Sequence, residues 1–289
     1  MRFALLAAAG LLIPLVAPAQ AAYELRFAPP EGYSQDFDID VRGSAEARGR
    51  KVNFEGDLTM NQTVVEVPDE EMQPLTVELT MTGGTIRYDD REKPPRYIGD
   101  PLTAHRSPMG AIMDVSKPLD DDDETGIDVT AAILYATSLL VFPERAARPG
   151  EDWDGSHEAF DPYGDYVPVT AENYFGDLLE LPDRTLVRVD SEGEFPYRAK
   201  IDDDWLYGTL KYALAVHMDL DTGSVVEAEL RLYGELKAKA SFVTVGISVE
   251  ELYVHVKETS HEVVDLEERA AAQEEAEQES DEGDGDTEA

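Results

Sequence analysis

The chain has 289 residues, no cysteine, and 62 acidic against 24 basic residues, which gives a formal net charge of -38 at pH 7. This composition disfavours nucleic acid and anionic membrane surfaces as partners, because both require a basic footprint that it does not supply. Without cysteine the chain has neither a disulfide nor a lipid-attachment site, so its core alone must stabilise the fold.

Residues 1–21 have the pattern of a secretory signal peptide. Arg2 precedes the apolar run FALLAAAGLLIPLVA, and the small-residue pattern Ala19-Gln20-Ala21 follows it. A membrane-spanning helix would need about 20 apolar residues, and this run is shorter. We therefore expect cleavage after Ala21, no transmembrane anchor in the mature chain, and a protein exported to the periplasm or the extracellular medium.

Residues 22–264 predict a single β-domain, because apolar and polar residues alternate with a period of two through most of this span. Each alternating stretch is typical of an antiparallel strand with one buried face. The first three apolar sets are Phe37, Ile39 and Val41; Val52, Phe54, Leu58, Met60 and Val64; and Leu75, Val77, Leu79 and Met81.

One segment breaks this pattern. The stretch TGIDVTAAILYATSLLVFP predicts a helix near residues 128–141, capped by Asp128 and ended by Pro143. Its large side chains make it apolar nearly all round, so we expect it to be buried against the concave face of the sheet. The acidic run before it, residues 120–124, lacks the EF-hand spacing, which favours a solvated loop over a calcium site.

The longest alternation surrounds an Asp-Thr-Gly triplet at residues 221–223. The preceding even positions carry Leu206, Leu210, Tyr212, Leu214, Val216, Met218 and Leu220, and the pattern resumes with Val226, Ala228, Leu230, Leu232 and Leu236. Two such strands joined at this triplet predict a hairpin, with Gly223 able to adopt a positive φ. The alternative, an aspartic protease, requires a second catalytic carboxylate. The chain has no second Asp-Thr-Gly, so we interpret Asp221 as a turn residue.

The last strand, SFVTVGISVEELYVHVKE, changes phase near Glu250 and Glu251, which predicts a β-bulge. Strands of about 15 residues would reach about 50 Å, and strands this long twist and curl. The expected fold class is therefore mainly β: a strongly curved antiparallel sheet, or half-barrel, with one short buried helix on its concave face.

A resemblance supports this architecture. The segments LLVFPERAARPGEDWDG, YVPVTAENYFGDL and DLDTGSVVEAELRL resemble secreted bacterial proteins in which an FP…PG-x-x-W turn precedes a long antiparallel meander. Their architecture is similar to the half-barrel of LolA-type lipoprotein carriers, and the likeness covers roughly residues 125–258. It implies a sheet that holds acyl chains beneath several helices. This chain predicts only one helix, which leaves the size of such a cavity open.

The C-terminal tail, residues 265–289, holds 12 acidic residues and one arginine. It cannot bury enough apolar surface to order itself, so we expect it to be disordered or weakly helical. The acid excess of the whole chain has two interpretations: solubility of an exported protein, or adaptation to a saline medium.

No motif for catalysis, metal or cofactor binding stands out. The five histidines show no compact ligand spacing, and His217 and His255 fall on the polar phase of their strands, so we expect them to be partly exposed. Trp153 and Trp205 are expected to anchor the core rather than to stack on a sugar. The sequence predicts neither an enzyme nor a bound metal or cofactor.

Three function classes remain open. A binding or carrier protein would hold a lipid, an acyl chain or an apolar peptide on the concave sheet face. A structural or envelope-associated protein would have a filled core there, and a hydrolase would use paired acids. Long strands make more concave surface than one short helix can cover, which favours the binding protein. The side chains predicted to contact the ligand are Leu206, Leu210, Tyr212, Leu214, Val216, Met218, Leu230 and Leu232.

Overall fold

The computed structural model describes residues 21–70, 72–88, 91–117, 129–201, 204–240 and 243–271. The proposed signal peptide up to residue 20, the acidic run at 120–124, Asp128 and the tail beyond residue 271 lie outside the described residues.

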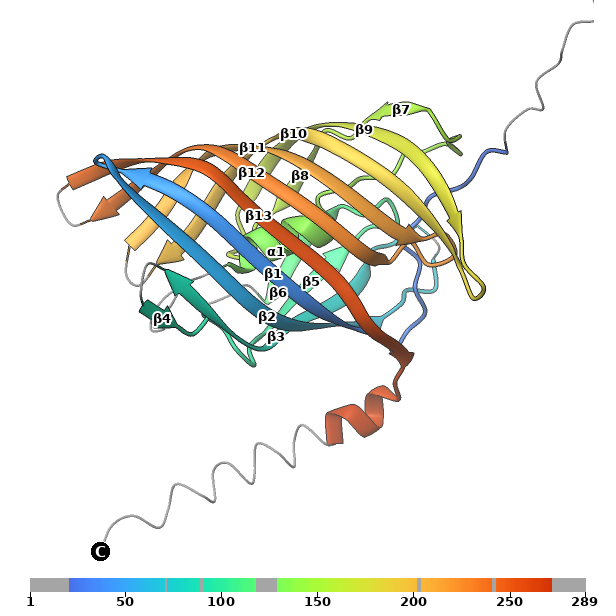
Figure 1. Ribbon diagram of the computed structural model, residues 1–289. Helices are drawn as coiled ribbons and strands as arrows, with labels where there is room; N and C mark the ends of the chain where they lie inside the picture. Colours follow the sequence, from blue (N-terminus) through green and yellow to red (C-terminus); the bar gives the residue numbers. More distant parts are fainter. Residues whose placement is uncertain are drawn as a thin grey trace, which may run out of the picture.

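The described residues form one antiparallel sheet of thirteen strands (Figure 1). Its order is β6-β5-β3-β2-β1-β13-β12-β11-β10-β9-β7, with β4 paired to β3 and β8 paired to β9. The first strand of the chain therefore lies beside the last, in the middle of the sheet. The strands are β1 (Tyr33–Ala47), β2 (Arg50–Glu66), β3 (Leu75–Tyr88), β4 (Arg91–Lys93), β5 (Pro101–Arg106), β6 (Ile112–Lys117), β7 (Asp152–Asp154), β8 (His157–Phe160), β9 (Tyr166–Glu180), β10 (Thr185–Ile201), β11 (Asp204–Asp219), β12 (Val225–Ala240) and β13 (Val243–Val263).

The sheet curls further than a half-barrel. Its two edges approach each other where β6 lies against β8, so the barrel is nearly closed and has a seam there. The cause is strand length: eight of the strands have 14 or more residues, and the right-handed twist accumulates across them. The predicted fold class, a mainly β protein with a strongly curved antiparallel sheet and one short buried helix, is confirmed.

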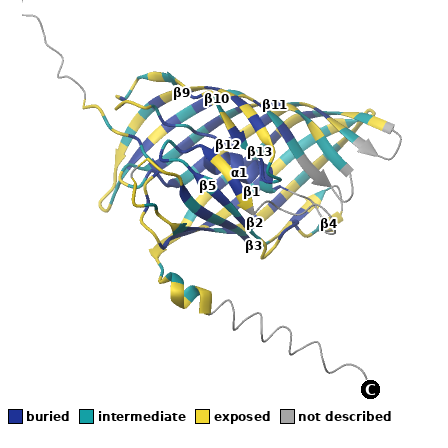
Figure 2. Cartoon of the chain, turned by 180° about the vertical axis from the view of Figure 1, so that it is seen from behind, coloured by how far each residue is buried: buried dark blue, intermediate teal, exposed yellow. Residues whose placement is uncertain are grey.

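The helix α1 (Thr130–Ser138) lies inside the curved sheet, where Figure 2 shows it as a buried segment. All of its residues except the first are buried, and it contacts β10, β12 and β13. Val129 holds the N-cap position without a side-chain cap. The expected cap, Asp128, lies outside the described residues. No helix in the described part of the chain is long and apolar enough to cross a membrane.

Arg106, at the end of β5, ties the C-terminal end of α1 to the sheet. Its Nη2 donates a hydrogen bond to the carbonyl oxygen of Thr137 at 3.1 Å, and its Nε donates to that of Gly110 at 2.9 Å. The side chain is buried, and burial lowers the pKa of its guanidinium to about 9. A cation near the C-terminal end of a helix is also stabilising, because that end of the helix dipole is negative.

The FP…PG-x-x-W turn anchors the chain after the helix. The carbonyl oxygen of Val141 accepts hydrogen bonds from Trp153 Nε1 at 2.7 Å and from Asn173 Nδ2 at 2.9 Å. Gly150 has a φ of 89°, which favours glycine, and its N–H donates to Phe175 on β9. The turn therefore fixes the exit of α1 to one edge of the sheet.

Two local predictions are confirmed in detail. Gly223 has a φ of 65° in the turn between β11 and β12, and the N–H groups of Asp221 and Thr222 both donate to Asp219 Oδ1. In β13, Glu250 is skipped in the pairing with β1, because Ser44 pairs with Glu251 and the next residue of β1 pairs with Val249. That irregularity is the predicted bulge.

The start of the tail is attached to the barrel. Residues 266–271 form a helical turn, and Asp265 Oδ1 accepts hydrogen bonds from the N–H groups of Glu267 and Glu268. Arg269 Nη2 lies 3.4 Å from Glu78 Oε2 on β3. The only basic residue of the tail thus forms an ion pair with the sheet.

Candidate functional site: an apolar cavity beside the helix

A cavity of about 280 Å³ lies between the inner face of the sheet and the N-terminal end of α1. Seven strands contribute to it, together with the residue that precedes the helix. The only polar side-chain atoms among its thirteen lining residues are two tyrosine hydroxyl oxygens. The lining residues are Ala45, Ala47, Val52, Phe54, Tyr88, Val129, Tyr197, Leu206, Leu210, Leu236, Ile247, Val249 and Leu252.

The cavity exists because the helix is much shorter than the strands. Nine helical residues span about 14 Å, whereas the 16 residues of β11 span about 50 Å. Beyond the N-terminal end of α1, no helix among the described residues packs on this part of the inner face.

Small residues widen this part of the barrel. The inner-face positions of β1 end in Ala45 and Ala47, and Gly208 and Gly234 take inner-face positions on β11 and β12. A Cβ added at Gly208 would lie 2.3 Å from the carbonyl oxygen of Glu235, so a larger residue does not fit there without displacing the backbone. Large side chains are therefore missing at several positions around the cavity.

The eight side chains predicted to contact a ligand divide into two groups. Leu206 and Leu210 line the cavity. The other six are at most 3% exposed and belong to the core that surrounds the helix: Tyr212, Leu214, Val216, Met218, Leu230 and Leu232. The sequence pattern identified the inner face correctly, but not which part of that face stays open.

Several lining residues were not among the predicted contacts. Phe54, Tyr88 and Tyr197 come from strands that the sequence analysis did not connect with the site. The sequence held a signal for the cavity itself but not for these three residues, since glycine and alanine interrupt the apolar phase of β1, β11 and β12 near the cavity. Such interruptions mark places where the inner face is not filled by its own side chains.

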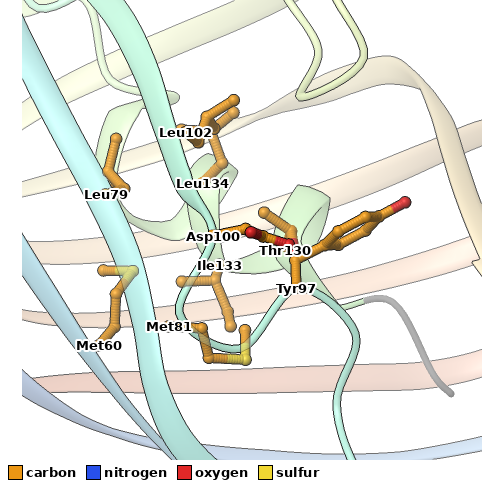
Figure 3. Close-up of a pocket in the computed structure, with 9 residues that line it drawn as sticks. All are labelled: Met60, Leu79, Met81, Tyr97, Asp100, Leu102, Thr130, Ile133 and Leu134. Atoms are coloured by element: carbon orange, nitrogen blue, oxygen red, sulfur yellow. The ribbon is translucent and has the colours of Figure 1, made fainter. Parts of the chain in front are cut away.

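A second hollow lies on another side of α1 and is shown in Figure 3. Its volume is about 20 Å³, which is room for about one water molecule. Met60, Leu79 and Met81 from β2 and β3 meet Ile133 and Leu134 there. On this side the helix packs closely on the sheet, and the hollow is too small for an organic ligand.

A polar cluster lies at the opposite end of the barrel, and its contacts connect neighbouring strands. The side chain of Glu258 is 4% exposed and accepts hydrogen bonds from Gln35 Nε2 at 2.6 Å and Arg184 Nη1 at 2.8 Å. His261 Nδ1 lies 2.8 Å from the same carboxylate. These contacts join β13, β1 and the turn before β10, far along β1 from the cavity.

The Asp-Thr-Gly turn lies near this polar cluster. Asp221 is exposed, whereas Ser224 is buried and its Oγ lies 2.7 Å from Thr222 Oγ1 and 3.4 Å from the hydroxyl of Tyr33. The hydroxyl groups of the triplet and its neighbour therefore stabilise the turn.

The histidines on the polar phase lie where the alternation placed them. His217 and His255, on the outer face, flank Glu227: His255 Nε2 lies 3.0 Å from Oε1 and His217 Nδ1 lies 3.7 Å from Oε2. Both side chains are about 30% exposed (32% and 28%). Within the described residues, no group of three or more histidines and acids is placed to hold a metal ion.

The two tryptophans have different environments. Trp153 is half-buried against the core, and Trp205 packs edge-on against Tyr163 with ring centres 4.8 Å apart. The guanidinium of Arg198 lies 5.1 Å from the Trp205 ring and pairs with Asp161, whose carboxylate is buried. Burial raises the pKa of Asp161. This cluster fixes the β8–β9 turn.

The cavity is the feature of the described residues that most resembles a ligand site, since it combines volume, an apolar lining and few polar groups. The sequence matches no protein-family model and no curated protein.

Proposed function

We propose that the protein binds a hydrophobic ligand, with an acyl or alkyl chain, in the cavity beside α1. The observation that carries the proposal is a volume of about 280 Å³ lined almost entirely by apolar side chains. Apolar cavities of about 150 Å³ already accept small hydrocarbons, and ligand pockets begin near about 300 Å³.

The apolar lining supports a bound ligand. An acyl or alkyl chain that enters the cavity replaces water at this lining, and the transfer of apolar surface out of water is favourable.

In this proposal the protein holds an acyl or alkyl chain between its curved sheet and its helix. The LolA-type half-barrels, which the sequence resembles, bind acyl chains in a similar way. We place it outside the cytoplasm, because residues 1–21 have the pattern of a signal peptide. The binding is non-catalytic.

Titration calorimetry with uncharged alcohols of increasing length tests the proposal. Each buried methylene contributes about 0.8 kcal/mol, so affinity should rise about fourfold per carbon from octanol to dodecanol until the cavity is full. Ala45→Phe and Ala47→Phe place a ring in the cavity and should each weaken the binding of dodecanol by about tenfold or more. Ala215→Phe, on the outer face of β11, is the matched control.

The alternative is a structural protein whose core is simply filled. Six of the eight predicted contact residues favour it, since they pack in the core around α1. Native mass spectrometry of protein purified from its own host separates the two functions. A co-purifying apolar molecule supports binding, whereas a bare protein that also fails to bind every alcohol supports the structural alternative.

A further inference from the structure

The cavity ends at one row of residues across the sheet. Gly43 on β1 pairs with Phe54 on β2 and with Leu252 on β13, so the three lie side by side on the inner face. Phe54 and Leu252 line the cavity. In the next row towards the middle of the barrel, Val41 and Val254 are 0% exposed. The row of Gly43, Phe54 and Leu252 is therefore the closed end of the cavity.

Phe54 occupies this closed end because Gly43 leaves room for its ring. A Cβ added at Gly43 would lie 2.1 Å from Cζ of Phe54, so the ring rests directly on the backbone of β1. The side chain of Phe54 is partly buried, and it packs against the core while it also lines the cavity. The ring therefore lies between the cavity and the core.

The lining extends well beyond the closed end. The row continues from Leu252 to Leu232 on β12 and Tyr212 on β11. The lining residue most distant from Tyr212 on β11 is Leu206, at the start of the strand. The six residues between these positions span about 20 Å along the strand, and a tilt of about 40°, typical of barrels, reduces this to about 15 Å along the barrel axis.

The volume of the cavity matches one chain of this length. An apolar cavity of about 150 Å³ accepts benzene with its six carbon atoms, which gives about 25 Å³ per carbon atom. At that ratio a volume of about 280 Å³ holds about eleven carbon atoms. An extended chain advances about 1.2 Å per bond, so a chain of about eleven carbon atoms is about 13 Å long. Two parallel chains of that length would need about twice the volume.

From these dimensions we propose that the ligand is a single unbranched chain of about ten to twelve carbon atoms, and that Phe54 sets this length by contacting its terminal methyl group. The inference rests on the proposed function and adds the shape and length of the chain. A polar end group would lose its hydration beside the buried core, whereas Ala45 and Ala47, towards the strand ends, are half-buried. The methyl end therefore takes the closed end.

Competition among uncharged alcohols tests the proposed shape and length. The protein is incubated with an equimolar mixture of octanol, decanol, dodecanol, tetradecanol and cyclododecanol and is then separated from the free alcohols. Gas chromatography measures the alcohols extracted from it. The bound amount should rise about fourfold per carbon atom from octanol to decanol, and tetradecanol should stay within about twofold of dodecanol. Cyclododecanol, with as many carbon atoms in a compact ring, should bind about tenfold less than dodecanol or weaker still.

Two substitutions at Phe54 should lengthen the preferred chain. Phe54→Ala removes the ring and makes room for about four more carbon atoms, so bound tetradecanol should exceed dodecanol about tenfold. Phe54→Leu keeps more of the packing and should shift this ratio in the same direction by about threefold, which preserves the test if the alanine variant does not fold. Phe160→Ala and Phe160→Leu are the matched controls, because Phe160 is also partly buried against the core but does not line the cavity.

The controls should keep the wild-type ratio of tetradecanol to dodecanol. A ratio that is unchanged in the Phe54 variants, or that shifts equally in the Phe160 variants, overturns the role of Phe54. Equal binding of cyclododecanol and dodecanol, or a tenfold preference of the wild type for tetradecanol over dodecanol, overturns the proposed shape or length. All four results leave the cavity proposal standing, whereas failure of every alcohol to bind overturns the proposed function itself.

Discussion

The guanidinium carbon of Arg106 lies 3.9 Å from the centre of the Phe27 ring, deep inside the protein. Both side chains are buried, and no carboxylate among the described residues forms an ion pair with this arginine. The charge is instead stabilised by the ring face and by two backbone carbonyl oxygens, one of them at the end of α1. Arg106 thus joins the segment before β1, the end of β5 and the helix.

Arg106→Ala should be strongly destabilising, by about 3 kcal/mol, because it opens a cavity and leaves two buried carbonyl groups without a donor. Arg106→Met should cost less, since it keeps the volume and removes the penalty of a buried charge. Urea unfolding measures both. Arg188→Ala, which breaks the exposed pair with Asp190, is the control and should change stability by less than about 1 kcal/mol. A loss at Arg106 no larger than the control would contradict the role given to it.

Substitutions at two nearby positions of the turn between β11 and β12 should differ strongly in their effect on stability. Asp221→Asn should change stability by less than about 0.5 kcal/mol, because the residue is exposed and its own N–H makes the contact. Gly223→Ala should cost about 2–4 kcal/mol, since a Cβ there would lie 1.7 Å from the carbonyl oxygen of Arg26 at a positive φ. Thermal melting distinguishes them. A peptidase activity that disappears in Asp221→Asn would show that Asp221 is a catalytic residue and would contradict its interpretation as a turn residue.

The helix should tolerate no charge on its buried side. Leu134 and Leu140 are 2% and 3% exposed, so Leu134→Asp and Leu140→Asp should each cost more than about 4 kcal/mol or prevent folding. Leu179→Asp is the control, because that side chain is 51% exposed. Circular dichroism melts of the three variants test this. Melting of either helix-region variant at the wild-type temperature would mean that the segment lies outside the core.

His157 should contribute to acid sensitivity. Its Nδ1–H donates to the carbonyl oxygen of Gly155 at 2.8 Å, and its Nε2 is buried with no hydrogen-bond partner among the described residues. Burial lowers the pKa of this imidazole below its ordinary value of 6.5. The unfolded chain then binds the proton more readily, so stability is complete above pH 6.5 and is lost as the pH falls from there towards the lower folded pKa.

Urea unfolding between pH 7 and 5.5 measures this effect. One proton gives a slope of at most about 1.4 kcal/mol per pH unit. His157→Phe cannot titrate, so its stability should fall less steeply with acid than that of the wild type, whatever its stability at pH 7. Parallel curves for the two proteins would rule out His157 as the source.

Salt should stabilise the protein. At about 1 M salt the Debye length falls to about 3 Å, which screens the mutual repulsion of the carboxylates. The melting temperature should therefore rise with sodium chloride. Deleting residues 265–289 should change it little, because most of the net charge lies on the barrel and the Arg269–Glu78 pair is partly exposed. A saturable stabilisation by micromolar calcium, lost when Asp120 to Asp123 are neutralised, would instead identify a metal site in that run.

The strands could be predicted because each one follows a local rule. The even positions from Leu210 to Met218 are buried because alternate residues of a strand point to opposite faces, and no knowledge of neighbouring strands is needed. The same holds for Gly223 and for the bulge at Glu250, which leave their mark in a few adjacent residues.

The open part of the inner face could not be predicted in this way. Leu210 and Leu214 follow the same alternation, yet one lines the cavity and the other does not. The difference depends on how far α1 reaches along the strands, which is a tertiary relationship. Closure of the sheet beyond a half-barrel likewise depends on the sum of many small twists.

The pairing of β1 with β13 has a consequence for the speed of folding. Tyr33 is opposite Val263, so the central pair of the sheet joins the two ends of the domain, and this ladder forms only after the last strand has been synthesised. Contacts so distant in sequence slow folding, because a long loop must close before any of them is gained. Until then the N-terminal hairpin and β12 each present an unpaired edge that can associate with other chains. Loss of β13 alone would make that transient state permanent.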